Sequence, residues 1–170
     1  MKPFYIGIDP GKSGAIVGLT NGKINVIDKM PPTTKQLWDY FIYLGFPNMI
    51  EREKTYVSIE AVHSMPTDGV RSAFSFGHHL GELDMVFAAL NIDPIRVRPS
   101  DWQRYFSIQR NKGEPKYQYK GRLVELAKSL CRADERDKMT RVTADAYLIA
   151  LYLSKNIEVL NGKEKENESV

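Results

Sequence analysis

Three acidic residues stand in otherwise apolar surroundings, where an acid is well placed to do chemistry. Asp9 ends the run "YIGID", Glu60 lies inside "VSIEAV", and Asp145 lies near the start of "TADAYLIALYL". An ionised carboxylate is costly to bury unless a cation accompanies it. Mg²⁺ prefers oxygen ligands and is commonly held by one or two carboxylates together with substrate phosphates. The three acids together predict a site for a divalent cation.

Each acid also has a purely structural interpretation. Asp9 can cap the turn after its strand, where Gly11 and Gly14 let the backbone turn sharply or come close to a ligand. Glu60 can pair with a basic side chain, and Asp145 can interact with the positive end of a helix dipole. Three such acids in one small domain favour a shared cation.

The elements that position these acids follow from the hydrophobic periodicity. Asn21-Gly22 separates two β-rich runs and is a strong hairpin signal. Thr33 or Thr34 can cap a helix. We expect the segment from Trp102 to Lys120 to be polar and irregular. The predicted strands are residues 4–9, two runs within 13–30, 54–62 and 94–99, and the later predicted helices are 70–90, 119–131 and 140–155.

This order predicts an α/β fold of the ribonuclease H-like type. Three antiparallel strands are followed by strands that helical crossovers deliver, which gives a mixed five-stranded sheet with helices on both faces. In this layout the first strand is central and the fourth lies beside it. We therefore expect Asp9 and Glu60 to lie side by side, with Asp9 the best candidate to bridge two ions.

Four segments resemble the RuvC-like Holliday-junction resolvases, in particular the bacteriophage-type branch. They are "IGIDPGKSGAI", "SIEAVHSMPTDGVRSAFSFGHHLG", "VRPSDWQ" and "TADAYLIALYL", in order over about residues 4–155. The resemblance implies that Asp9, Glu60 and Asp145 bind Mg²⁺, for which Mn²⁺ would substitute. It also implies that they hydrolyse phosphodiesters in branched DNA, leaving 5′-phosphate and 3′-hydroxyl ends. Two ions about 4 Å apart would activate a water and stabilise the leaving oxygen.

One departure from that family leaves an alternative open. The family often has a second acid or a histidine three or four residues before the final aspartate, where this chain has Val142 and Arg141. The second metal site and full activity are therefore open. The alternative is a junction-binding module of the same fold with weakened catalysis. A nucleotide cofactor is not expected, because ATP-binding domains that also open on an acid and a glycine turn need two such domains.

The basic residues predict contact with nucleic acid, since cations neutralise phosphates and aromatic rings stack on bases. Eight basic residues fall within positions 96–122, interleaved with Trp102, Tyr105, Phe106, Tyr117 and Tyr119. A solvated loop with a few core aromatics is the structural alternative, and Trp102 and Phe106 suit a core. Lys138 and Arg141 lie seven and four residues before Asp145, so we expect them to share its helical face. The residues we expect to bind DNA are Lys112, Lys116, Lys120, Arg104, Arg110, Lys138 and Arg141.

The predicted helix 70–90 is the candidate dimer interface. Phe74, Gly77, Gly81 and Met85 recur at helical spacing, and a four-way junction of near two-fold symmetry suits a homodimer. Packing within the monomer explains the two glycines equally well. His78 and His79 lack metal-ligand spacing, so we expect them on the helix surface, whereas His63 follows Glu60 closely enough to support it.

Composition bounds the remaining possibilities. The 170 residues are 42% hydrophobic and 26% charged, which suits one globular domain, expected at residues 1–157 with a charged, disordered tail at 158–170. A single cysteine, Cys131, excludes an internal disulfide and a Cys-rich zinc site. No run is long enough to span a membrane, and no secretion signal is recognisable, so we expect a cytoplasmic protein. The net charge of +3 is too small to indicate a partner.

Overall fold

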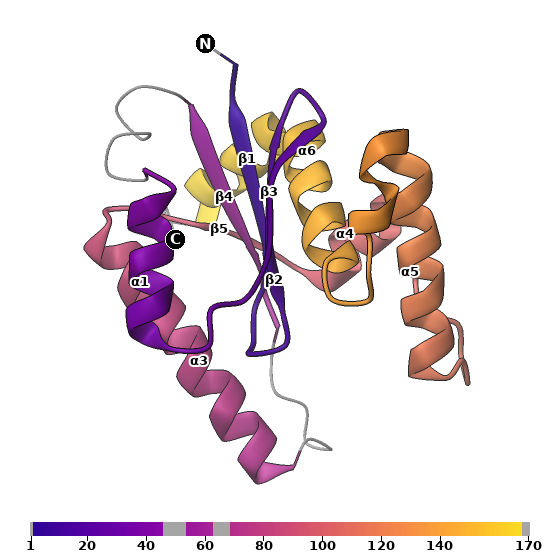
Figure 1. The fold of residues 1–170 in the computed structure, drawn as a ribbon, viewed down its shortest axis with the longest axis horizontal. Helices are drawn as coiled ribbons and strands as arrows, with labels where there is room; N and C mark the ends of the chain where they lie inside the picture. The colour runs from indigo at the N-terminus through magenta and orange to yellow at the C-terminus, as the bar shows by residue number, and fades with distance from the viewer. Residues whose placement is uncertain (1, 46–53, 63–68, 168–170) are drawn as a thin grey trace.

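The computed structural model describes residues 2–45, 54–62 and 69–167, with side chains described as far as residue 157. One five-stranded sheet, in the order β3-β2-β1-β4-β5, forms its centre. Helices cover both faces of the sheet (Figure 1). The strands are β1 (Phe4–Asp9), β2 (Ala15–Thr20), β3 (Lys23–Lys29), β4 (Thr55–Glu60) and β5 (Ile95–Val97).

The first three strands form the predicted antiparallel meander. Asn21 and Gly22 connect β2 to β3 with φ of 51° and 70°, the positive values that a tight hairpin turn requires. β4 then pairs in parallel with β1, and β5 in parallel with β4. The mixed α/β sheet, its central first strand and the adjacent fourth strand are all as predicted.

Two apolar clusters fill the space between the sheet and its helices. α1 and α3 pack with Ile6, Ile8 and Ile59 of the sheet, whereas α5 and α6 pack with Val17 and Leu19. α1 begins after Thr33, whose side chain accepts a hydrogen bond from the Gln36 N–H, as predicted for a cap. The helices are α1 (Thr34–Tyr43), α3 (Val70–Ala89), α4 (Pro99–Tyr105), α5 (Lys116–Leu130), the 3₁₀ helix η1 (Ala133–Lys138) and α6 (Ala144–Asn167).

The second half of the chain is more regular than the sequence predicts. α4 occupies part of the segment expected to be irregular, because Pro99 and Asp101 suit the first turn of a helix. α6 begins only at Ala144, so Lys138 and Arg141 precede it and do not share a helical face with Asp145. That prediction is wrong.

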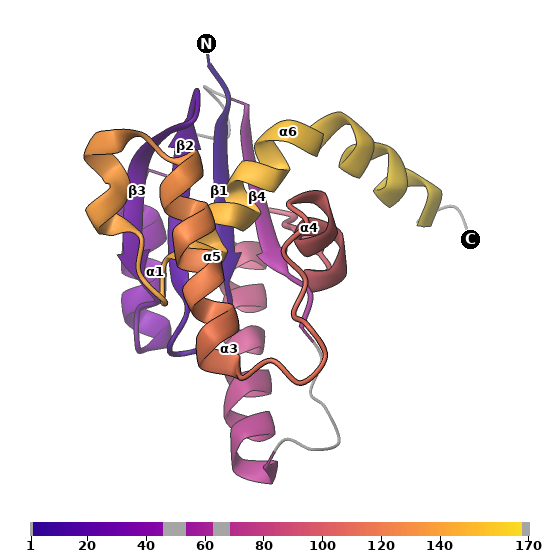
Figure 2. The same cartoon turned by 90° about the vertical axis from the view of Figure 1, so that its right-hand side faces the viewer.

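α6 also continues beyond its predicted end near 155 and reaches Asn167, so most of the expected tail is helical. Its last turns extend away from the sheet (Figure 2). The Lys and Glu residues at 163–166 have good helix propensity, which explains the extension. No helix in the described part of the chain has the length and apolar character needed to cross a membrane.

A buried glutamate joins η1 to the hairpin. Glu135 is 2% exposed and accepts a hydrogen bond of 2.8 Å from the Ile24 N–H, 111 residues away. The pairing of β2 with β3 shifts register between Gly18 and Leu19, beside this contact. The carboxylate thus satisfies a backbone donor at an irregular point of the sheet.

Candidate active site

The turn after β1 explains the glycine spacing next to Asp9. A Cβ on Gly14 would lie 1.9 Å from the Asp9 carbonyl oxygen, so only glycine fits there. The Gly14 N–H donates to the Gly11 carbonyl at 2.9 Å, and Gly11 has a φ of +104° that side chains rarely adopt. The Phe76 ring of α3 lies against Gly11. This tight turn presents Asp9 at the end of the central strand.

Glu60 lies on the neighbouring strand at the same edge. Gly7 pairs with Ser58 and Ile8 with Ile59, so Asp9 and Glu60 are the next residues of two parallel strands. The Glu60 side chain is buried, and its Oε1 accepts a hydrogen bond of 2.8 Å from Trp102 Nε1. An indole donor therefore fixes this carboxylate, whereas the structural alternative expected a basic partner.

Asp145 reaches the same edge because α6 packs directly on β1. A Cβ on Gly7 would lie 2.4 Å from the Ala146 carbonyl oxygen and 2.3 Å from the Ala150 nitrogen. The missing side chain of Gly7 lets the helix backbone touch the strand. Gly7 lies two residues before Asp9, so both residues face α6. This contact brings Asp145, in the first turn of α6, to Asp9.

A fourth charged residue completes the cluster. The ammonium of Lys120, on α5, forms an ion pair and hydrogen bond with Asp145 Oδ2. The Lys120 side chain is only 25% exposed and is engaged with Asp145, although it was expected, like Lys112 and Lys116, to bind DNA. A helical pattern on α5 indicates which residues face the domain but not that one of them meets an acid on α6.

The surroundings of Asp9 and Glu60 disfavour the ionised forms of these two carboxyl groups. Burial, together with the carboxylates of Asp145 and Glu60, raises the pKa of Asp9 to about 8. Burial likewise raises the pKa of Glu60 to about 7, although the Trp102 hydrogen bond acts in the opposite direction. Burial is the largest single influence on the pKa of Lys120 and lowers it, but the charge and hydrogen bond of Asp145, together with the charges of Asp9 and Glu60, raise the pKa overall. The cluster is therefore short of positive charge.

The chemistry of the donors fits a hard divalent cation. All three acids offer oxygen, and Asp145 Oδ1 is buried without a hydrogen-bond partner among the described residues. In the arrangement seen, no three His, Cys, Asp or Glu side chains of the described ranges form a group that could hold a metal ion. Lys120 instead occupies Oδ2 of Asp145.

The basic residues near this edge fall into two groups. Arg98 pairs with Asp101, Arg122 pairs with Glu114, and Arg96 pairs with Asp84. Arg110 is exposed and donates to the Glu114 carbonyl oxygen. The exposed cations for which the described part of the chain offers no hydrogen bond or ion pair include Arg104, Lys112, Lys116, Lys138 and Arg141.

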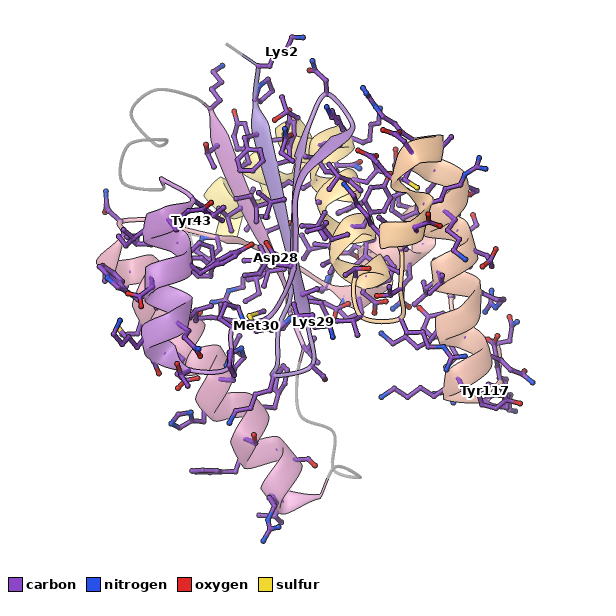
Figure 3. The ribbon with its side chains drawn as sticks, viewed as in Figure 1. Lys2, Asp28, Lys29, Met30, Tyr43 and Tyr117 are labelled. Carbon is purple, nitrogen blue, oxygen red and sulfur yellow. The ribbon has the colours of Figure 1, made fainter. Side chains whose placement is uncertain are left out.

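The start of α5 carries an exposed lysine close to the acidic site and an exposed tyrosine. Lys116, at the start of α5, is near enough to Asp9 to lower its pKa. Tyr117 follows it, is 61% exposed and lies at the end of the helix that points away from the core (Figure 3). Trp102 is fully buried and Phe106 packs against the core, as the sequence suggested.

The candidate dimer face of α3 is open in the structure. Phe74 and Met85 are 74% and 52% exposed, and a Cβ on Gly77 or Gly81 would meet no atom of the described residues within 4 Å. Packing of these glycines within the monomer is therefore not seen. His79 is buried against Glu82, 3.1 Å from Nδ1 to Oε2, so its expected surface position is wrong, whereas His78 is exposed as predicted. His63 lies outside the described residues.

The five-stranded mixed sheet and the helices on its two faces have the ribonuclease H-like α/β fold. Within that class the fold is RuvC-like. A structure titled "T. thermophilus RuvC in complex with Holliday junction substrate" has a TM-score of 0.59 and 15% identity, covering 92% of this chain and 95% of that one. A second Thermus thermophilus RuvC structure has a TM-score of 0.54 at 15% identity, covering 92% and 96% of the two chains. No family model and no curated protein matches the sequence.

Proposed function

We propose that this chain is a metal-dependent, structure-selective endodeoxyribonuclease that cleaves Holliday junctions and other branched DNA. The observation that carries the proposal is the meeting of Asp9, Glu60 and Asp145 at one edge of a RuvC-like sheet. A RuvC structure of the same fold is described as a complex with a Holliday junction substrate. The motifs quoted above further suggest the bacteriophage-type branch.

Each residue has a distinct part in this proposal. Asp9, Glu60 and Asp145 would hold Mg²⁺ or Mn²⁺, and Trp102 would keep Glu60 in place. The ion, when bound, supplies an activated water and stabilises charge on the phosphate. Phosphates of the DNA arms would be neutralised by two exposed lysines, Lys112 just before α5 and Lys116 at its first residue.

The test is cleavage of a labelled four-way junction compared with linear duplex of the same sequence, with Mg²⁺ or with a chelator. We expect cleavage of the junction alone, and only with metal. Asp145→Asn should abolish cleavage and leave junction binding intact, because the substitution removes a ligand oxygen charge but little volume. Junction cleavage by Asp145→Asn at the wild-type rate would contradict the assignment.

A second candidate function is junction binding with weakened catalysis. Val142 and Arg141 stand where a further acid would serve a second ion, and Lys120 already occupies one oxygen of Asp145. A nicking assay on a cruciform plasmid separates the two functions. A protein that binds the four-way junction tightly but leaves the plasmid intact at high Mg²⁺ and Mn²⁺ is a binding module.

The active form proposed is a homodimer through α3, since resolving a junction takes two nicks on opposed strands. The exposed Phe74 and Met85 flank two glycines that leave room for a second helix. Two-fold assembly would place two identical sites on one axis.

A further inference from the structure

Lys120 stands among three acids that the proposed function assigns to a metal ion. Its ammonium contacts Asp145 Oδ2, and its positive charge also lowers the pKa of Asp9 and of Glu60. Lys120 comes from α5, whereas the acids come from β1, β4 and α6. A separate element of the fold thus supplies a cation to the acidic edge.

The charges show what this cation achieves. If all three carboxyl groups ionise to bind a metal ion, one ammonium leaves two negative charges in a largely buried cluster, and a divalent cation would balance them. Lys120 offers a single point charge on a flexible four-carbon chain, which can reorient without moving α5. Asp145 keeps Oδ1 free of any hydrogen bond from the described residues, while Lys120 takes Oδ2.

We propose that Lys120 is an internal substitute for the metal ion. Without a divalent cation it holds Asp145 at the edge of the sheet, and on metal binding its ammonium leaves Asp145 Oδ2. The reason is electrostatic, because a bound divalent ion becomes the largest local charge and repels a neighbouring ammonium. The proposal rests on the metal site of the proposed function but not on cleavage of DNA.

One consequence is that the Lys120 contact affects the stability of the metal-free chain and its affinity for metal in opposite directions. The Lys120 contact must be broken before a metal can use Oδ2, so the contact stabilises the metal-free chain and weakens metal binding. Removing the ammonium should therefore have opposite effects on these two quantities. A lysine with only a structural role would lower the stability with and without metal alike.

The first experiment measures both quantities on the full chain without DNA. Lys120→Met keeps an unbranched stem and removes the ammonium, and Lys112→Met is the matched control at an exposed lysine. In chelator, Lys120→Met should melt several degrees below the wild type. Calorimetric titration with Mn²⁺ should show about ten-fold tighter binding, since a charge-assisted contact no longer competes. Lys112→Met should match the wild type in both measurements.

The second experiment needs no variant and so does not depend on one folding. The wild-type lysines are labelled with an amine-reactive reagent, with and without Mg²⁺, and quantified by mass spectrometry. Lys120 should react several-fold faster with metal present, while the exposed Lys112 serves as an internal reference.

The outcomes separate this proposal from the proposed function. Metal binding by the wild type, with no tighter binding by Lys120→Met and unchanged labelling of Lys120, overturns the exchange and leaves the nuclease intact. Failure of both proteins to bind Mn²⁺ or Mg²⁺ at millimolar concentration overturns both. Tighter binding by the variant together with faster labelling of Lys120 supports the exchange, whether or not DNA is cleaved.

Discussion

The close contact between Gly7 and α6 predicts that a larger residue at position 7 displaces α6 and, with it, Asp145. In a Gly7→Ala variant the new Cβ would lie 2.3 Å from the Ala150 nitrogen, 2.4 Å from the Ala146 carbonyl oxygen and 2.8 Å from the Ala150 Cα. Ordinary van der Waals contact begins at 3.4 Å. All three neighbours are backbone atoms, so no side chain can rotate aside, and α6 has to move outward by about 1 Å.

The size of the effect follows from that displacement. Overpacking costs about 1–3 kcal/mol, and we expect the upper end because a whole helix must shift. For a chain of this length about 3 kcal/mol lowers the melting temperature by roughly 6–12 °C. Asp145 precedes Ala146, so it moves away from Asp9 with the helix. A displacement of about 1 Å can reduce a catalytic rate about 100-fold.

Thermal melting, Mn²⁺ titration and junction cleavage together test this reasoning. Gly121→Ala on α5 is the control, because a Cβ there meets nothing within 4 Å, and we expect it to raise the stability slightly. Gly7→Ala should fold, melt lower, bind Mn²⁺ more weakly and cleave far more slowly. A Gly7→Ala protein with the melting temperature and metal affinity of the wild type would refute the account of how α6 positions Asp145.

Three further predictions concern pH, DNA and assembly. The raised pKa of Asp9, about 8 against an ordinary 3.8, means that the folded state binds this proton more tightly than the unfolded chain. The metal-free protein should therefore lose stability as pH rises from about 5 to 8, and Asp9→Asn should flatten that fall in thermal melts. Replacing Lys112 and Lys116 by Ala should lower the slope of log affinity against log salt by about one unit per lost phosphate contact, and an unchanged slope would exclude these lysines from the interface. Gly81→Arg should give a monomer by light scattering that nicks a cruciform plasmid without paired cleavage, whereas a monomeric wild type, free and on a junction, would exclude the dimer.

The arrangement of the strands could be predicted because each signal was local. Asn21-Gly22 fixes a hairpin, and short apolar runs bounded by turn residues identify the strands. The strand order, with the first strand central and the fourth beside it, came from the ribonuclease H-like layout that this order of elements matches, and it places Asp9 beside Glu60. The acids themselves were recognisable because each interrupts an apolar run.

The partners of those acids could not be predicted in the same way. Trp102 was expected to be a core aromatic, which it is, but the direction of its N–H toward Glu60 depends on how α4 packs. Lys120 was expected to bind DNA, because one basic residue among eight carries no local sign that it faces Asp145. Both contacts join segments that are far apart in the chain, and side-chain orientation across such distances depends on tertiary packing.

The Glu135 contact with β3 bears on whether copies of this chain could join through the sheet. β3 is one edge of the sheet, and an edge strand with free N–H groups is a template for strand addition and aggregation. Here a carboxylate takes the Ile24 N–H, a bulge disturbs the pairing next to it, and Asp28 and Lys29 are exposed at the end of the strand. The opposite edge, β5, has only three residues. Neither border of the sheet is a long, regular strand that a second chain could extend, which leaves helical surfaces as the natural route to ordered self-association.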